Sequence, residues 1–148
     1  MMRRAAWLVL LATLGQAACH SAHVLEPQDL PPDSDIAVDF RTDKTQYQIG
    51  ASARTVMVNH SPNPLTMGVC NDALELQVPG GWYEIPHPAI ACIALAIVIA
   101  PGDSATLSVS LEHADSPGTY RIRRFFSVVQ GNASSTKYRR TNTFTIVR

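Results

Sequence analysis

Three cysteines are the residues of this chain best suited to covalent chemistry. Cys70 and Cys92 lie on either side of Trp82, whereas Cys19 lies alone near the amino terminus. Two such thiols can form a disulfide, bind a metal or serve as reactive groups. The pair lacks the short spacing of a zinc site, so we expect no metal there. One thiol is left over, and in an exported protein it needs a role of its own.

The other side chains that commonly catalyse reactions do not form a recognised motif. His20 and His23 are three positions apart, but the sequence places no third metal ligand near them. Asp72 and Glu75 could act as an acid–base pair only within a pocket, which the sequence does not predict. Nucleophile-elbow, zinc-protease and phosphate-loop motifs are all absent from the sequence. We therefore expect a protein that is not an enzyme and has no cofactor.

The first 18 residues have the pattern of a signal peptide. Two arginines precede an apolar stretch, residues 5–14, that is too short to cross a bilayer. Cys19 follows two small residues, as in bacterial lipoproteins, although Gln16 stands where those proteins prefer an aliphatic residue. Either Cys19 is lipidated and anchors the protein to a membrane of the cell envelope, or ordinary cleavage releases a secreted protein. The odd cysteine favours the lipid anchor.

The rest of the chain divides into a short linker and one domain. Residues 19–34 contain three prolines and little apolar pattern, which predicts a tether between the membrane and the domain. Residues 35–148 are numerous enough for a single domain with a hydrophobic core. The formal net charge of the chain is zero, so we expect no nucleic-acid partner.

Acidic and basic residues are separated along the chain. Six acids and a single base, Arg41, lie between positions 26 and 43, whereas seven bases and no acid lie from Tyr120 to the end. One interpretation is a basic face that binds an anionic envelope polymer or a lipid head group. We favour the other, in which the first and last strands are neighbours and neutralise each other, each exposed pair contributing about 0–1 kcal/mol.

From residue 35 onward, apolar and polar residues alternate with the period of β-strands. Proline- and glycine-rich turns separate the alternating stretches, and Pro79-Gly80-Gly81 predicts a hairpin. The expected strands are residues 35–41, 53–60, 65–70, 74–78, 82–85, 89–100, 105–111, 119–129 and 141–147. This pattern predicts an all-β sandwich of about seven to nine antiparallel strands.

Residues 89–100 are the most apolar stretch of the domain and separate large from small side chains. In a strand the large side chains would lie on one face and the small ones would leave the other face flat. The flat face could be covered by a loop or could dock a partner or a second copy of the chain. The large side chains expected on the inward face are Ile93, Leu95, Ile97 and Ile99.

Two further predictions concern the carboxyl-terminal third of the chain. Within residues 119–129 the alternation would place Arg124 inside, which predicts a bulge that turns it away from the core. Residues 130–135 predict a polar loop, and residues 130–140 are the best candidate for contact with a partner. The candidate contact residues are Lys137, Tyr138, Arg139 and Arg140.

An ordered set of short motifs extends over residues 35–148. They are VMVNHSPNPLTMGVC, GGWYEIP, Cys92, IAPGDSATLSVSL, GTYRIRRFF and TNTFTIV. The set resembles the bacterial immunoglobulin-like domains of secreted proteins and lipoproteins. The resemblance implies a β-sandwich that commonly has no catalytic residues.

The resemblance also implies roles for individual residues. Cys70 and Cys92 would form the disulfide of the domain, which closes a loop of about 22 residues and contributes roughly 3 kcal/mol in the chain-entropy model. Trp82 would be a core tryptophan. The turn that leads into the strand expected at residues 119–129 would contain Gly118, Tyr120 and Arg121.

Together these observations predict a non-catalytic module that is exported, lipid-anchored and active in binding or scaffolding at the bacterial cell envelope. Its partner would be an unknown protein or an envelope polymer. A second hypothesis is a peptidase inhibitor that uses sandwich loops, because residues 63–68 resemble an inhibitory loop of some bacterial immunoglobulin-like domains.

Overall fold

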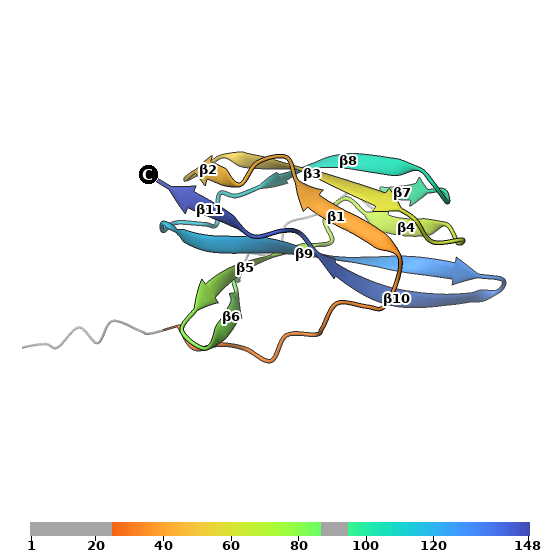
Figure 1. Cartoon of the computed structure of the whole chain (residues 1–148), viewed down its shortest axis with the longest axis horizontal. Helices are drawn as coiled ribbons and strands as arrows, with labels where there is room; N and C mark the ends of the chain where they lie inside the picture. Colours follow the sequence, from red (N-terminus) through yellow and green to blue (C-terminus); the bar gives the residue numbers. More distant parts are fainter. Residues whose placement is uncertain (1–24, 87–94) are drawn as a thin grey trace, which may run out of the picture.

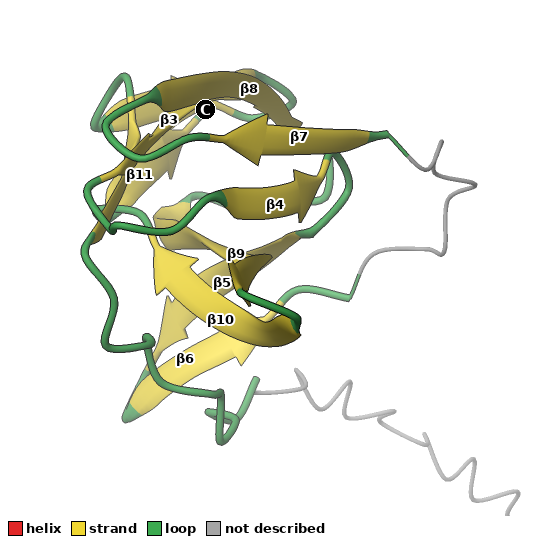
Figure 2. Cartoon of the chain, turned by 90° about the vertical axis from the view of Figure 1, so that its right-hand side faces the viewer, coloured by secondary structure: helices red, strands yellow, loops and turns green. Residues whose placement is uncertain are grey.

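The computed structural model of the chain describes residues 25–86 and 95–148, which form eleven strands joined by loops (Figures 1 and 2). Within these two ranges there is no helix long and apolar enough to span a membrane. The strands form two sheets that pack face to face as a β-sandwich. The predicted all-β sandwich is therefore confirmed, whereas the predicted signal peptide lies outside the described residues.

The smaller sheet contains β1 (Val38–Thr42), β3 (Ser52–Asn59) and β8 (Ser104–Ser110), with β3 in the centre and both pairings antiparallel. The alternation of residues determines which side chains face the other sheet. In β1, for example, Val38, Phe40 and Thr42 are buried and the two residues between them are exposed. On the outward face of β3, Ser52 and Arg54 are exposed, and the two valines that mark the strand in the sequence are half-buried.

The larger sheet is built around one long strand. Its strands are β2 (Gln46–Gln48), β4 (Leu65–Gly68), β5 (Asp72–Val78), β6 (Gly81–Glu84), β7 (Ala96–Ile99), β9 (Gly118–Gln130), β10 (Ala133–Arg140) and β11 (Phe144–Val147). Strand β9 pairs with β5, β4, β10 and β11, so it is the central strand that joins the others into one sheet. Strand β2 pairs in parallel with β11, a pairing that the antiparallel sequence prediction did not include.

Large side chains of β9 fill the space between the sheets. Tyr120, Ile122, Phe126 and Val128 are each at most 2% exposed. Because successive side chains of a strand point to opposite faces, these four lie on the same face of the sheet. Each buried side chain of this size contributes about 1.5–3 kcal/mol relative to an exposed one.

Arg124 belongs to the same inward-facing row of β9, and the predicted bulge is wrong. The pairing of β9 with β5 and with β10 continues through Arg124 without an inserted residue, and Arg124 is 1% exposed. Its guanidinium is compensated inside the sandwich, because it donates two hydrogen bonds to Asp72, with 2.5 Å between Nε and Oδ1. A third donor, Nη1, lies 3.4 Å from the sulfur of Met67. A buried charge with such partners needs no bulge.

Residues 25–34, here called the N-terminal strap, lie along the outer face of the larger sheet beneath β6 and β10 (Figure 1). The amide of Gln28 donates to the carbonyl of Trp82 over 2.9 Å, and the amide of Ser34 donates to the carbonyl of Tyr138 over 2.9 Å. The amide of Tyr138 in turn donates to the Ser34 hydroxyl over 2.9 Å. The described part of the predicted tether is therefore attached to the domain.

Asn59 connects the two sheets through a fully buried amide side chain. Its Nδ2 donates to the carbonyl oxygens of Asn63, over 2.8 Å, and of Ile99 in β7, over 3.0 Å. Its Oδ1 accepts from the amide and the hydroxyl of Ser61, over 3.0 and 2.7 Å. These bonds hold the turn after β3 and link that strand to β7 of the larger sheet.

Replacing Asn59 by alanine should therefore leave several buried polar groups without their hydrogen-bond partner. We expect Asn59→Ala to lower the free energy of unfolding by about 2–4 kcal/mol in urea denaturation. Asn132→Ala provides the matched control, because Asn132 lies exposed in the turn between β9 and β10, and its effect should stay within about 0.5 kcal/mol. Equal effects of the two substitutions would contradict the bridging role of Asn59.

Candidate functional site

A cluster of charged side chains surrounds Glu75 on the outer face of the larger sheet. The Glu75 side chain is 0% exposed and contacts three arginines, and we call these four residues the Glu75 cluster. Oε2 lies 2.6 Å from Nε of Arg121 and 2.9 Å from Nε of Arg140, and Oε1 lies 3.0 Å from Nε of Arg123. One carboxylate thus contacts three positive charges that come from two strands, β9 and β10.

Strand register brings the members of the Glu75 cluster together. Glu75 of β5 is directly opposite Arg121 of β9, and Arg123 is on the same face two residues further along β9. Arg140 of β10 is opposite Arg123 on the other side of β9. The cluster therefore depends on the pairing of β5 with the β9–β10 hairpin, which lies far from β5 in the sequence.

Further acidic groups balance the arginines of the cluster. Glu84 of β6 pairs with Arg123, and Asp33 of the N-terminal strap lies 2.9 Å from Nη1 of Arg140. Arg140 also donates to the carbonyl of Pro31 over 2.6 Å. Burial by itself would lower the pKa of Arg140, but the hydrogen bond and charge of Glu75, together with Asp33, raise the pKa above its ordinary value. Arg140 therefore stays charged and joins the strap to the sheet.

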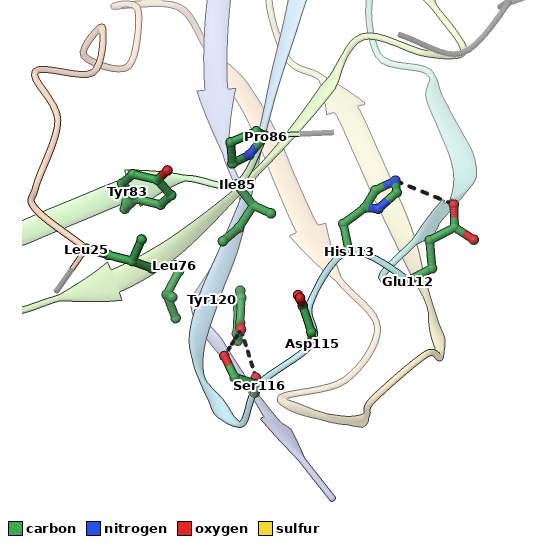
Figure 3. Close-up of a pocket in the computed structure, with 10 residues that line it drawn as sticks. All are labelled: Leu25, Leu76, Tyr83, Ile85, Pro86, Glu112, His113, Asp115, Ser116 and Tyr120. Atoms are coloured by element: carbon green, nitrogen blue, oxygen red, sulfur yellow. Dashed lines mark hydrogen bonds and ion pairs between the residues drawn. The ribbon is translucent and has the colours of Figure 1, made fainter. Parts of the chain in front are cut away.

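A second feature lies at the end of the sandwich, where the β5–β6 hairpin projects away from the smaller sheet (Figures 1 and 2). A cleft of about 580 Å³ opens between this hairpin, the strap and the connection from β8 to β9, and we call it the hairpin cleft. Figure 3 shows Leu76, Tyr83 and Ile85 of the hairpin region along one side, with Leu25 of the strap beside them.

Polar groups form the other side of the hairpin cleft. Glu112, His113 and Asp115 lie on the β8–β9 connection, opposite the hairpin (Figure 3). At the base, the hydroxyl of Tyr120 donates to the carbonyl of Ser116 over 2.8 Å, which fastens this connection to β9. The cleft thus combines an apolar wall with an acidic wall.

Comparison with known proteins identifies the family of this sandwich. Residues 34–145 match the bacterial Ig-like domain family. The chain belongs to this family. No curated protein matches the chain. Among solved structures, a β-glucosidase from Listeria innocua, in complex with glucose, has 12% identity and a TM-score of 0.34; the match covers 90% of this chain and 21% of the enzyme chain. The Ig-like chain thus spans about a fifth of that enzyme's length.

The cysteines predicted to carry covalent chemistry in this Ig-like domain are described only in part. Cys70 is exposed and lies shortly after β4. Cys92 and Cys19 lie outside the described residues, as does His23. The disulfide and the lipidation site therefore stay predictions.

The predicted contact loop of the Ig-like domain is wrong as a description of its structure. Residues 133–140 form strand β10, which pairs with β9 along its whole length. Gly131 permits the tight turn before it, with a φ of +60° that suits glycine. That these residues contact a partner stays a prediction. The structure places Tyr138 and Arg140 toward the strap, and Lys137 and Arg139 on the opposite face of the strand.

Trp82 is not a core residue, in contrast to the expectation. Its side chain is half-buried on the outer face of the larger sheet, and the Arg121 guanidinium lies 3.8 Å from its ring centroid. Trp82 is directly opposite Gln77 of β5, which is on the same face as Glu75. The tryptophan therefore covers the Glu75 cluster and contributes a cation–π contact to it.

Asp72 and Glu75 cannot act together as an acid–base pair. They lie three positions apart in β5 and so point to opposite faces of the sheet. Asp72 pairs with Arg124 between the sheets, whereas Glu75 pairs with three arginines outside them. Both carboxylates therefore serve structural roles.

Residues 63–68 do not form a protruding loop. Leu65 and Met67 are 0% and 1% exposed in β4, so these side chains fill the core and are not available to enter a peptidase cleft.

In β7, which pairs with β4, Ile97 and Ile99 face inward as predicted, but Leu95 is 54% exposed. Ile93 and the rest of residues 89–94 lie outside the described residues.

The Glu75 cluster predicts a large effect of removing one negative charge. Glu75→Gln should leave three arginines around a neutral side chain and lower the free energy of unfolding by about 3–5 kcal/mol. Urea denaturation followed by tryptophan fluorescence measures this value. Glu26→Gln in the exposed part of the strap is the control and should change stability by less than about 0.5 kcal/mol. A loss below about 1 kcal/mol for Glu75→Gln would contradict the central role of this carboxylate.

Proposed function

We propose that this chain is a non-catalytic Ig-like module of the bacterial cell envelope, exported by its leader, anchored by a lipid on Cys19 and active in binding or scaffolding. The observation that carries this proposal is the match of residues 34–145 to the bacterial Ig-like domain family. Such a domain leaves residues 1–33 for export and attachment, and these include the leader pattern and Cys19.

The ion pairs of Asp72 and Glu75 support a binding module over an enzyme. A general acid or base must exchange a proton with its substrate during each turnover. Glu75 and Asp72, the acids that the sequence offered for that role, are instead held by arginines in ion pairs. Such pairs hold the carboxylates in fixed positions, which suits a rigid scaffold.

Attachment of the strap to the sheet sets the distance from a lipid anchor. Cys19 precedes Leu25, the first described residue of the strap, by only six positions. A fully extended chain of that length spans about 20 Å at 3.3–3.6 Å per residue. A lipid on Cys19 would therefore hold the domain close to the membrane, nearer than the full predicted tether of residues 19–34 would allow.

Lipid anchoring is tested by changing the acceptor thiol. We expect the wild-type chain to incorporate a labelled fatty acid in cells and to fractionate with membranes, because a lipid on Cys19 binds the bilayer. Cys19→Ser should remove the label and release the protein into the soluble fraction. Ser21→Ala serves as the control and should behave as the wild type. Labelling that persists in Cys19→Ser, or is missing from the wild type, would overturn the anchoring proposal.

We also propose that Cys70 and Cys92 form a disulfide, as an exported compartment permits. The mass of the purified chain under non-reducing conditions should be about 2 Da below that of the reduced chain, because two hydrogen atoms leave when the bond forms. Alkylation before reduction should modify neither cysteine, whereas alkylation after reduction should modify both. Identical masses before and after reduction would contradict the disulfide.

A further inference from the structure

The hairpin cleft has the size and composition of a ligand site and is not needed to complete the core. Its volume of about 580 Å³ lies within the usual range of about 300–1,000 Å³ for ligand sites. It exists because the smaller sheet does not cover the inner face of the β5–β6 hairpin, as Figures 1 and 2 show. Leu76 and Tyr83, which are opposite each other on that face, are accordingly left half-buried.

The acidic wall of the hairpin cleft determines the charge of a suitable ligand. Among the described residues that line the cleft there is no lysine or arginine, whereas Glu112 and Asp115 are both present and exposed. The ionisable neighbour of Glu112 is His113, with 3.5 Å between Oε1 and Nε2. By contrast, Glu75 and Glu84 nearby are paired with arginines. The cleft therefore favours a cation and disfavours an anionic polymer.

The apolar wall determines what the cation must be attached to. Leu76, Tyr83 and Ile85 face the acidic residues across the cleft in Figure 3. Leu25 of the strap extends this wall and is 37% exposed. A ligand that places a positive charge beside aliphatic or aromatic groups would match both walls, and a peptide with basic and apolar residues has this composition.

The strap contributes Leu25 to the apolar wall because neighbouring residues of the strap dock on the hairpin. Pro27 packs directly on Gly81, where an added Cβ would lie 2.8 Å from the Cβ of Pro27. Only glycine allows this close approach without a shift of the strap. The side-chain oxygen of Gln28 also accepts a hydrogen bond from the amide of Glu84 over 3.0 Å. Leu25 is thereby held at the edge of the cleft.

We propose that the hairpin cleft binds a basic peptide segment of a partner protein. A lysine or arginine side chain of the peptide contacts Glu112 and Asp115, and a neighbouring apolar side chain packs on Leu76, Tyr83 and Ile85. This assignment rests on the proposed binding function, since it names the class of partner that the envelope module recognises.

The test measures binding of dye-labelled pentapeptides to the whole chain, purified in a non-ionic detergent, by fluorescence anisotropy. The probe is acetyl-Leu-Lys-Leu-Arg-Leu-amide, and the comparison peptide carries glutamates in place of its two basic residues. We expect the wild-type chain to bind the basic peptide, with affinity falling as salt rises, and not to bind the acidic one. The double variant Glu112→Gln, Asp115→Asn should bind the basic peptide about tenfold more weakly.

Two further variants separate local effects from changes in folding or total charge. Asp103→Asn removes an exposed acid in the turn between β7 and β8, and should leave peptide affinity unchanged. Leu25→Ser removes an exposed apolar group of the strap and should weaken binding about threefold. Urea denaturation of each variant confirms that the domain is folded under the conditions of the titration.

Several outcomes would overturn the proposal. These are no binding of the basic peptide, equal binding of the acidic peptide, or an unchanged affinity of the double variant. Binding of chitotriose with no binding of the peptide would assign the cleft to a polysaccharide and would also overturn it. Fatty-acid labelling of Cys19 is measured independently, so a failure of anchoring and a failure of peptide recognition can be told apart.

Discussion

The buried carboxylate of Glu75 is the interaction on which the larger sheet depends. Removing a carboxylate from water costs several kcal/mol, and only close, well-oriented partners offset that cost. Arg121, Arg123 and Arg140 supply them from two other strands. A shift of either pairing by one residue would move arginines or Glu75 into the apolar space between the sheets. The cluster therefore favours one register of β5, β9 and β10 and gives the strap a place to bind through Asp33.

Most carboxyl-terminal arginines in the described ion pairs contact acids from the middle of the chain and not the acids of the amino-terminal segment. Asp33 is the acid from the amino-terminal set that contacts the carboxyl-terminal bases among the described ion pairs, through Arg140. The arginines of β9 pair with Asp72 and Glu75 of β5 and with Glu84 of β6. The predicted pairing of the first and last strands is wrong, because β1 pairs with β3 and β11 pairs with β2 and β9. Asp33 lies in the strap and not in a strand, and the remaining pairs arise because β9 lies beside β5. The same β5–β6 hairpin, uncovered on its inner face, creates the hairpin cleft.

Several elements could be recognised in advance because their own residues determine them. The alternation of Ala105, Leu107 and Val109 marks β8, and Pro79-Gly80-Gly81 marks the β5–β6 hairpin. Strand β10 could not be recognised, because residues 133–136 are small, polar and exposed and carry no apolar alternation. That strand forms because Gly131 turns the chain back along β9 and because its later residues meet the strap. The hairpin cleft also escaped prediction, since its walls come from three separate segments.

The sequence by itself determined the strand periodicity, most of the turns and membership of the bacterial Ig-like family, because these depend on residues close together or on an ordered set of motifs. Only the tertiary structure decided where the charges lie. Arg124 is inside because Asp72, 52 positions earlier in the chain, meets it there. Glu75 is buried because its partners Arg121 and Arg140, 46 and 65 positions away, reach it through strand pairing. Local alternation specifies a strand and its two faces, whereas the free energy of burying an ion depends on partners that only the folded chain brings within reach.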